Sequence, residues 1–273
     1  KKIAAELREG LKKNVVELKS TYNAIPGLTV ILVGEDTPSK IYVKNKEKFA
    51  KEVGMNSEII RYPENVEEKI VLNKIKELNN NNKVSGILVQ LPLPDGFETE
   101  KILSRIALEK DVDALNPTTL KKIDDDEESY FPAGVVAVLE IFERYKIGIK
   151  GKNIMVIGIS DLLGRPLSSI LKNRGGDVRK IDVGDHLTFE DLVSSDIIVT
   201  EISKPEWLKA DMVKEGVVVI DAANNYIDGK VIGDVDFNQV SEKASVITPV
   251  PGGVGPMTVA MLMSNVVEAA SKD

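Results

Sequence analysis

The sequence predicts an α/β protein of two domains, an N-terminal α/β substrate domain and a Rossmann-type domain with a doubly wound parallel sheet, with a cleft between them. Short apolar runs alternate with helical patterns along most of the 273 residues, which is typical of βα units. The acidic stretch 124–128 lies in a charged connector over 118–130 and marks the domain boundary. We therefore place the substrate domain at 1–130, with a C-terminal helix at 256–273 packing back on it, and the Rossmann domain at 131–255.

The elements of the first domain follow from apolar spacing and from residues that begin or end helices. Thr37 is suited to cap a helix that Pro38 opens and Gly54 ends. The spacing of apolar residues predicts further helices at 1–20 and 67–78 and strands at 28–33, 57–62 and 84–89.

The elements of the second domain repeat the same alternation. Pro132 opens a helix that runs to Tyr145. Strands are expected at 154–157, 177–181, 196–199, 217–221 and 245–247. Helices are expected at 163–173, 189–193 and 257–270.

Composition excludes several kinds of site and partner. The sequence contains no cysteine, which excludes disulfides, thiolate metal sites and cysteine nucleophiles. His186 is the only histidine and is interpreted as an exposed loop residue, so no metal site is predicted. The formal net charge of -7 and the lack of a basic block argue against nucleic acid, and no apolar run reaches the ~18 residues of a membrane span. We expect a cytoplasmic protein with no membrane or nucleic-acid partner.

One lysine falls on the inward face of the helix at 37–54. Helical spacing places on that face Tyr42, Lys46, Phe49, Ala50 and Val53. Such a lysine either snorkels to water or is held in a polar pocket, where burial lowers the pKa of its ammonium group and makes it useful for proton transfer. The spacing leaves both alternatives open.

Further polar groups are expected near this lysine. Two prolines directly after the strand 84–89 end it and place Gln90 at its carboxyl edge. Parallel strands end at one edge of a sheet, so Gln90 is expected near Lys46. The following loop carries Asp111 and Asp113, which are either solvated surface or a functional pair.

The stretch 158–166 has the context of a phosphate-binding turn, because it follows a buried strand and opens a helix. Ser160 and Leu163 stand where the usual G-x-G-x-x-G pattern has its second and third glycines. An ordinary βα turn is therefore the alternative.

The end of the next strand bears on the choice of dinucleotide. Asp182 follows that strand, and an acidic group there accepts a hydrogen bond from a ribose 2′-hydroxyl and favours NAD. Arg179 and Lys180 are adjacent and would favour the 2′-phosphate of NADP instead. The sequence leaves this choice open.

The loop 248–258 combines three prolines with three glycines between a strand and a helix. Glycines let the backbone approach a flat ligand closely, and prolines fix the shape of the loop. We interpret it as a ligand-lining loop in preference to a connector.

Together these stretches resemble the bifunctional methylenetetrahydrofolate dehydrogenase/methenyltetrahydrofolate cyclohydrolase family along nearly the whole chain. Six blocks in order make coincidence implausible. They are Ser39-x-x-Tyr42-x-x-x-Lys46, 86–94, 110–113, Gly158-x-Ser160-x-x-x-Gly164-x-Pro166, 233–237 and 249–258.

The resemblance implies roles for individual residues. Lys46 matches the catalytic lysine of the family, Tyr42 the tyrosine one turn before it, and Gln90 the glutamine that orients and tunes the lysine. Asp113 matches the carboxylate that anchors the pterin ring, with Asp111 in support. The resemblance places at the substrate Leu91, Pro251, Gly252, Gly253 and Gly255. It places at the dinucleotide Gly158, Ser160, Arg165, Pro166, Arg179, Lys180 and Asp182.

The activity implied by the resemblance has two steps. The enzyme would oxidise 5,10-methylenetetrahydrofolate with NADP, or alternatively NAD, and hydrolyse the methenyl product to 10-formyltetrahydrofolate. This reaction belongs to one-carbon metabolism and supplies purine biosynthesis. The family also implies a homodimer.

The chain departs from the family pattern at four places. Ile159 replaces a common arginine, Ala114 ends the usual Asp-Val-Asp-Gly, and Asp182 with Val183 replaces a histidine-serine pair. The segment 129–134 lacks the usual cysteine and threonine. These changes leave the folate chemistry intact and leave specificity on the adenosine side open.

Two other hypotheses stand beside the folate enzyme. One is a different two-domain dehydrogenase acting on a small acid, with Lys46 and Asp113 as its lysine-aspartate pair. The other is a dinucleotide-sensing module in which the Tyr42/Lys46 face serves only packing. Dependence of turnover on folate separates them.

Overall fold

The computed structural model describes residues 2–127, 129–182 and 187–272. The expected exposed position of His186 lies outside these residues. The described chain forms two compact units. The first unit comprises 2–122, 129–133 and 259–272, and the second comprises 123–127, 134–182 and 187–258. The prediction placed 123–127 in the first domain, whereas they belong to the second unit. The chain passes from one unit to the other after 133 and after 258, in each case three residues later than predicted.

The first unit is built on a three-stranded parallel sheet of order β2-β1-β3. Its strands are β1 (Gly27–Val33), β2 (Asn56–Tyr62) and β3 (Gly86–Val89), as predicted to within two residues. All seven residues of the central strand β1 are buried, because both faces of the sheet are covered. On one face, Val71 and Ile75 of α3 (Glu68–Asn79) pack with residues of β1 and β3.

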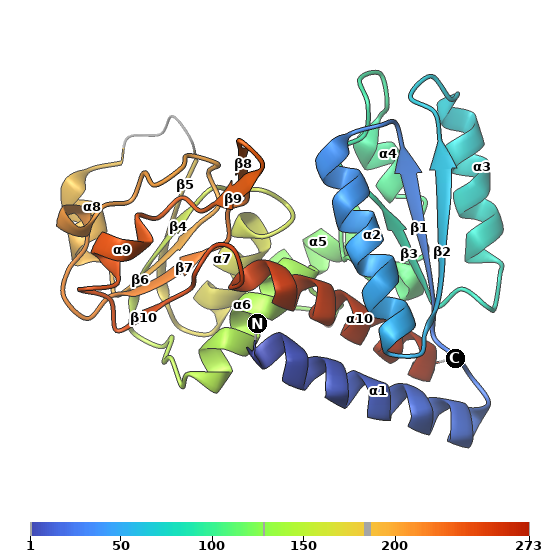
Figure 1. The fold of residues 1–273 in the computed structure, drawn as a ribbon, viewed down its shortest axis with the longest axis horizontal. Helices are drawn as coiled ribbons and strands as arrows, with labels where there is room; N and C mark the ends of the chain where they lie inside the picture. The colour runs from blue at the N-terminus through green and yellow to red at the C-terminus, as the bar shows by residue number, and fades with distance from the viewer. Residues whose placement is uncertain (1, 128, 183–186, 273) are drawn as a thin grey trace. The chain divides into compact units, whose positions relative to one another are not determined.

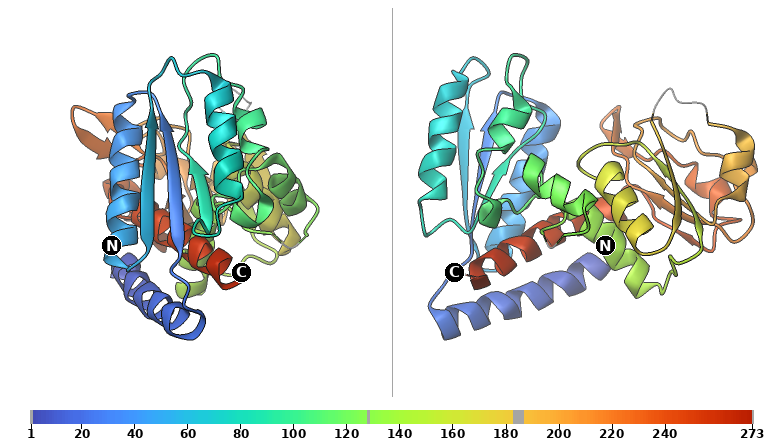
Figure 2. Two further views of the ribbon diagram at one scale, coloured as in Figure 1. Left: turned by 90° about the vertical axis from the view of Figure 1, so that its right-hand side faces the viewer. Right: turned by 180° about the vertical axis from the view of Figure 1, so that it is seen from behind.

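Helices surround this sheet (Figure 1). They are α1 (Lys2–Tyr22), α2 (Thr37–Glu52), α3, α4 (Thr99–Leu103), the 3₁₀ turn η1 (Leu108–Lys110), α5 (Pro117–Asp124) and α10 (Val254–Lys272). The last helix returns to the first unit, where it runs beside α1 (Figures 1 and 2) and where Val266 lies against Gly86 at the start of β3. Among the described residues, no helix is both long and apolar enough to cross a membrane.

The expected connector at 118–130 is wrong in its first half, which is the helix α5. Pro117 suits a first helical position, and the side chain of Asn116 accepts a hydrogen bond from Thr118 N at 2.8 Å, so the helix starts well without an acidic first turn. The cap of α2 also differs from the prediction. Asp36 in place of Thr37 accepts from Ser39 N at 2.8 Å.

The second unit contains a five-stranded parallel sheet of order β10-β7-β6-β4-β5. The strands are β4 (Asn153–Ile157), β5 (Asp177–Ile181), β6 (Ile197–Thr200), β7 (Val218–Asp221) and β10 (Val246–Ile247). The chain passes from β4 outward to β5 and then back to β6 on the other side of β4, so the topological switch point lies between β4 and β6. Ligands of open α/β sheets bind at the carboxyl ends of strands at such a point.

The helices of the second unit are α6 (Ala133–Arg144), α7 (Gly164–Asn173), α8 (Phe189–Ser194), the 3₁₀ turn η2 (Ala210–Met212) and the short α9 (Phe237–Val240). Three of them, α6, α7 and α8, match the predicted alternation, whereas η2 and α9 were not predicted. An antiparallel hairpin of β8 (Asn225–Ile227) and β9 (Lys230–Ile232) was not predicted. Its Asp228-Gly229 turn is a hairpin signal in the sequence, and both residues have positive φ.

Candidate active site

Two polar residues of α2 lie on the face that also packs into the first unit. Tyr42 and Lys46 are one turn apart and half-buried, and below them Phe49 and Ala50 are buried. The apolar end of the face anchors the helix, so the polar end is held at the carboxyl edge of the sheet. The predicted inward face of α2 is confirmed.

Gln90 meets Lys46 at this edge, as the strand order requires. Because β3 pairs with β1, the backbone N of Gln90 donates to Ile31 O at 2.9 Å, which fixes Gln90 at the end of the strand. Lys46 Nζ donates to Gln90 Oε1 at 3.0 Å. Gln90 Nε2 donates to Leu91 O at 2.7 Å, so the amide is oriented with its oxygen toward the lysine.

Asp113 supplies the opposite charge to this group. Burial lowers the pKa of the Lys46 ammonium group, and the carboxylate of Asp113 partly opposes that shift. Burial likewise raises the pKa of the Asp113 carboxyl, and the charge of Lys46 opposes it. Lys46 is therefore a partly desolvated amine that donates to Gln90, which favours the polar-pocket alternative over snorkelling.

Asp111 is turned into the protein and holds the loop that carries Asp113. It is 1% exposed, and its oxygens accept from Leu115 N at 3.2 Å, Asn116 N at 3.0 Å and Thr119 Oγ1 at 2.7 Å. Burial raises its pKa, and these three hydrogen bonds act against the shift. Asp111 thus supports the site through the backbone.

A contact missed by the sequence analysis fixes the same loop from α10. Asn265 is buried, and its Nδ2 donates to Val112 O at 2.8 Å and to Phe131 O at 3.1 Å. Asn265 is 153 residues from Val112, so no local pattern indicates this pairing. A buried asparagine within an apolar helix is the only sequence signal of such a role.

The turn after β4 in the second unit has the shape of a phosphate-binding turn. Gly158 has φ +100°, which favours glycine, and a Cβ on Gly164 would collide with the carbonyl oxygen of Gly158. Pro166 is buried in the first turn of α7. The residue before that helix is Leu163, whose side chain makes no capping hydrogen bond. The close approach of strand to helix and the N–H groups at the start of α7 fit a dinucleotide phosphate.

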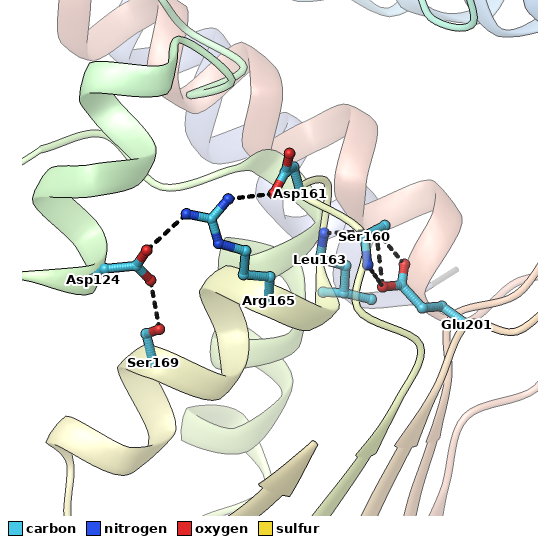
Figure 3. A network of polar contacts seen from close by, with 7 residues as sticks. All are labelled: Asp124, Ser160, Asp161, Leu163, Arg165, Ser169 and Glu201. Atoms are coloured by element: carbon cyan, nitrogen blue, oxygen red, sulfur yellow. Dashed lines mark hydrogen bonds and ion pairs between the residues drawn. The ribbon is translucent and has the colours of Figure 1, made fainter. Parts of the chain in front are cut away.

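A carboxylate of the chain lies against this turn, where Figure 3 shows Glu201 hydrogen-bonded to Ser160. Glu201 follows β6, and its Oε1 accepts from Gly164 N at 2.8 Å and from Ser160 N at 3.2 Å. The Ser160 hydroxyl lies 2.8 and 2.9 Å from the two oxygens of Glu201. Burial raises the pKa of Glu201, and the hydrogen bonds from Ser160 and Gly164 act against that shift. The sequence analysis missed Glu201, although a polar residue directly after a buried strand is the same signal that located Gln90.

Arg165 lies in the first turn of the same helix, between Asp124 and Asp161 (Figure 3). Its guanidinium group donates to Asp161 and to Asp124, each at 2.8 Å. Burial alone would raise the pKa of Asp124, but hydrogen bonds from Ser169 and Arg165 lower it below the usual value. The acidic stretch at the predicted domain boundary is therefore tied to α7 by Asp124.

The three residues expected near the adenosine lie at the end of β5. Arg179, Lys180 and Asp182 are all exposed. Arg179 forms an ion pair with Asp191 of α8. The charge of Lys180 contributes to lowering the pKa of Asp124. The ion pair directs Arg179 to a carboxylate of the chain, whereas Lys180 acts on Asp124 through its charge.

The proline- and glycine-rich loop runs from β10 to α10 in the second unit. The peptide bond between Val250 and Pro251 is cis, and Gly252 has φ +113°. A Cβ on Gly253 would lie 2.5 Å from Pro249 O, so this position requires glycine. Pro251 is exposed, whereas Gly252, Gly253 and Gly255 are half-buried.

Comparison with known proteins identifies the family. Residues 1–113 match the model of the tetrahydrofolate dehydrogenase/cyclohydrolase catalytic domain, and 132–273 match the NAD(P)-binding domain of the same family. The chain is 46% identical to the bifunctional protein FolD of Pelagibacter ubique over 98% of this chain and 95% of that one.

Solved structures agree with this similarity. The FolD methylenetetrahydrofolate dehydrogenase/cyclohydrolase of Campylobacter jejuni superposes with a TM-score of 0.97 at 39% identity and covers 100% of this chain and 97% of that one. The Trypanosoma brucei enzyme, solved with NADP and an inhibitor, gives a TM-score of 0.95 at 30% identity, with 99% and 95% covered. The chain belongs to the tetrahydrofolate dehydrogenase/cyclohydrolase family.

Proposed function

We propose that this protein oxidises 5,10-methylenetetrahydrofolate to the 5,10-methenyl cation with NADP or NAD and hydrolyses the cation to 10-formyltetrahydrofolate, within one-carbon metabolism. Membership of the family supports both steps. The observation that carries the assignment in this chain is the hydrogen bond between Lys46 and Gln90 beside Asp113. A small acid substrate or a packing role for the lysine has no comparable support.

Lys46 moves the proton of the hydrolytic step in this proposal. Water that adds to the cationic methenyl carbon loses both of its protons as its oxygen becomes the formyl oxygen. The departing ring nitrogen gains one of these protons, and the other is released. An amine whose pKa is lowered by burial can take up and release a proton nearer neutral pH than an exposed lysine can. Gln90 keeps the Lys46 amine in place, because its own amide is fixed by Leu91 O.

Asp113 anchors the substrate in this proposal. The pterin ring presents neighbouring N–H groups along one edge, and a carboxylate accepts hydrogen bonds from such an edge. Asp111 and Asn265 act through the backbone of the loop between them. Tyr42 and Leu91 would line the same site. Tyr42 supplies an aromatic ring, and Leu91 supplies a carbonyl group that the amide of Gln90 holds in place.

The second unit would hold the dinucleotide. The nicotinamide, when bound, accepts hydride from the one-carbon unit of the substrate. We assign Gly158, Ser160, Arg165 and Pro166 to its phosphates, and the loop 251–255 to the face that it shares with the folate. Arg179 and Lys180 favour NADP and Asp182 favours NAD, so both are carried forward, with NADP first.

The test is absorbance-monitored turnover with NADP and NAD in parallel, followed by hydrolysis of added methenyltetrahydrofolate. Lys46→Met is expected to lower hydrolysis by at least ~10²-fold, the usual contribution of a general acid-base group, and to leave dinucleotide Kd unchanged. Lys44→Met is the matched control, because Lys44 is exposed on the same helix. Unchanged hydrolysis in Lys46→Met would remove Lys46 from the mechanism.

Assembly and location complete the proposal. The family resemblance supports a homodimer in the cytoplasm. Light scattering after gel filtration distinguishes one chain from two, and a mass of one chain at working concentration would contradict the dimer.

A further inference from the structure

The space beside Gly158 in the turn after β4 is filled by the side chain of Glu201, whereas a Cβ on Gly164 would first meet the carbonyl oxygen of Gly158. A Cβ on Gly158 would lie 2.6 Å from Glu201 Cγ, and a Cβ on Gly164 would lie 2.7 Å from Glu201 Oε1. In dinucleotide-binding turns this space admits the pyrophosphate, which approaches the backbone where side chains are absent. Glu201 thus lies where the phosphate is expected.

Glu201 also uses the hydrogen-bond donors that a phosphate would use. Gly164 N, Ser160 N and the Ser160 hydroxyl all donate to its carboxylate. The N–H groups in the first turn of a helix prefer an anion, because the helix dipole points its positive end toward them. Gly164 N is the donor of this set that belongs to α7, and the N–H and hydroxyl groups of Ser160 lie in the turn before it. Glu201 therefore occupies one helix N–H group and two donors of the turn.

The position of Glu201 in the fold makes the overlap specific. Glu201 follows β6 and Gly158 follows β4, so the two flank the switch point of the sheet. Glu201 N donates to Ile157 O at 2.9 Å, which fixes its backbone beside the turn. Its side chain reaches the donors of the turn from a neighbouring strand end.

We propose that Glu201 is an internal anion that competes with the dinucleotide pyrophosphate for the N-terminus of α7 and thereby weakens cofactor binding. This inference rests on the proposed function, which places a dinucleotide at this turn. The bound state requires Glu201 to leave Gly164 N and Ser160, and its negative charge then opposes the phosphates from nearby. Glu201 is accordingly a determinant of affinity in this chain.

Isothermal titration with NADP, NAD, ADP-ribose and adenosine tests this competition. Glu201→Gln removes the charge at nearly constant shape, and Glu201→Ala removes the side chain. Both are expected to tighten NADP or NAD and ADP-ribose about tenfold and to leave the affinity for adenosine, which has no phosphate, unchanged. Glu215→Gln is the control, because it removes an exposed carboxylate of the same unit.

Thermal unfolding provides a second readout. Without nucleotide, both Glu201 variants are expected to unfold at lower temperature than the unaltered protein, because the donors of α7 lose their anion. ADP-ribose is expected to raise the unfolding temperature more in the variants than in the unaltered protein. A purely structural Glu201 would lower the first value and leave the second difference unchanged.

The outcomes separate the inference from the proposed function. Dinucleotide binding that is unchanged or weaker in both variants, or equal tightening of adenosine, overturns the competition and leaves the proposed function standing. Failure of every folded form to bind a dinucleotide overturns both. A crystal structure of the unaltered protein with ADP-ribose decides the matter without any variant. The pyrophosphate on Gly164 N with Glu201 displaced supports competition, and Glu201 still bound to Gly164 N overturns it.

Discussion

Replacement of Asp111 by alanine should destabilise the first unit and loosen the loop that carries Asp113. The carboxylate of Asp111 accepts from two backbone N–H groups and one hydroxyl, all of them in or next to the start of α5. Alanine leaves the N–H groups of Leu115 and Asn116 buried without an acceptor. The hydroxyl of Thr119 can rotate toward another partner, so it contributes less.

The size of the effect follows from these two N–H groups. A buried donor that loses its acceptor costs about 1–3 kcal/mol, so two cost about 2–6 kcal/mol. Burial of the Asp111 carboxylate is itself unfavourable, so its removal offsets part of this cost. The expected net loss is about 2–4 kcal/mol in the free energy of unfolding. That is a large share of the ~5–15 kcal/mol typical of a folded domain.

Urea unfolding followed by two signals locates the loss. Far-ultraviolet circular dichroism reports both units, whereas fluorescence of Trp207, the only tryptophan, reports the second unit. Asp111→Ala should shift the first signal more than the second and should raise the KM for folate. Asp95→Ala is the control, since Asp95 is exposed in the same unit. A loss below ~1 kcal/mol, or one equal to that of Asp95→Ala, would refute the assigned role of Asp111.

Three further predictions concern the same two sites. Hydrolysis should rise as Lys46 loses its proton, and the charge of Asp113 raises the pKa of that lysine. Asp113→Asn should therefore move the rising limb of the kcat profile, measured at saturating substrate, to lower pH. A shift to higher pH would contradict the coupling. Asn265→Ala leaves two carbonyl groups without their donor, so the free energy of unfolding should fall by about 1–3 kcal/mol and the KM for folate should rise. Unchanged stability in urea would rule out the tie between α10 and the loop. Gly164→Ala forces the turn apart, so NADP and NAD affinity measured by titration should fall at least ~10-fold while hydrolysis of added methenyltetrahydrofolate continues; full affinity would show that the turn is not the dinucleotide site.

The sequence was sufficient where a local pattern decides the structure. Buried strands are apolar runs, and the carboxyl ends of parallel strands meet at one edge, so the approach of Gln90 to Lys46 could be predicted from order alone. The inward face of α2 followed from spacing in the same way.

The remainder depends on contacts between residues that are distant in the sequence. Ser160 and Glu201 are 41 residues apart. The sequence analysis considered the turn by itself and did not include the end of β6, where Glu201 supplies the carboxylate. Asp111 was grouped with Asp113 because the two are adjacent in one motif, but alternate residues of a tight loop point in different directions. Only the fold shows that Asp111 faces the backbone of α5.

The two sites differ in how their polar groups are used, and this difference predicts separable activities. Lys46 and Gln90 engage each other in the first unit, whereas the donors at the start of α7 are taken by Glu201 in the second. Glu201→Gln should therefore change oxidation of methylenetetrahydrofolate at limiting dinucleotide and leave hydrolysis of added methenyltetrahydrofolate unchanged. Lys46→Met should lower hydrolysis and leave the affinity for the dinucleotide unchanged. If Glu201→Gln altered hydrolysis as strongly as oxidation, Glu201 would act on the folate chemistry itself, and the separation of the two roles would be wrong.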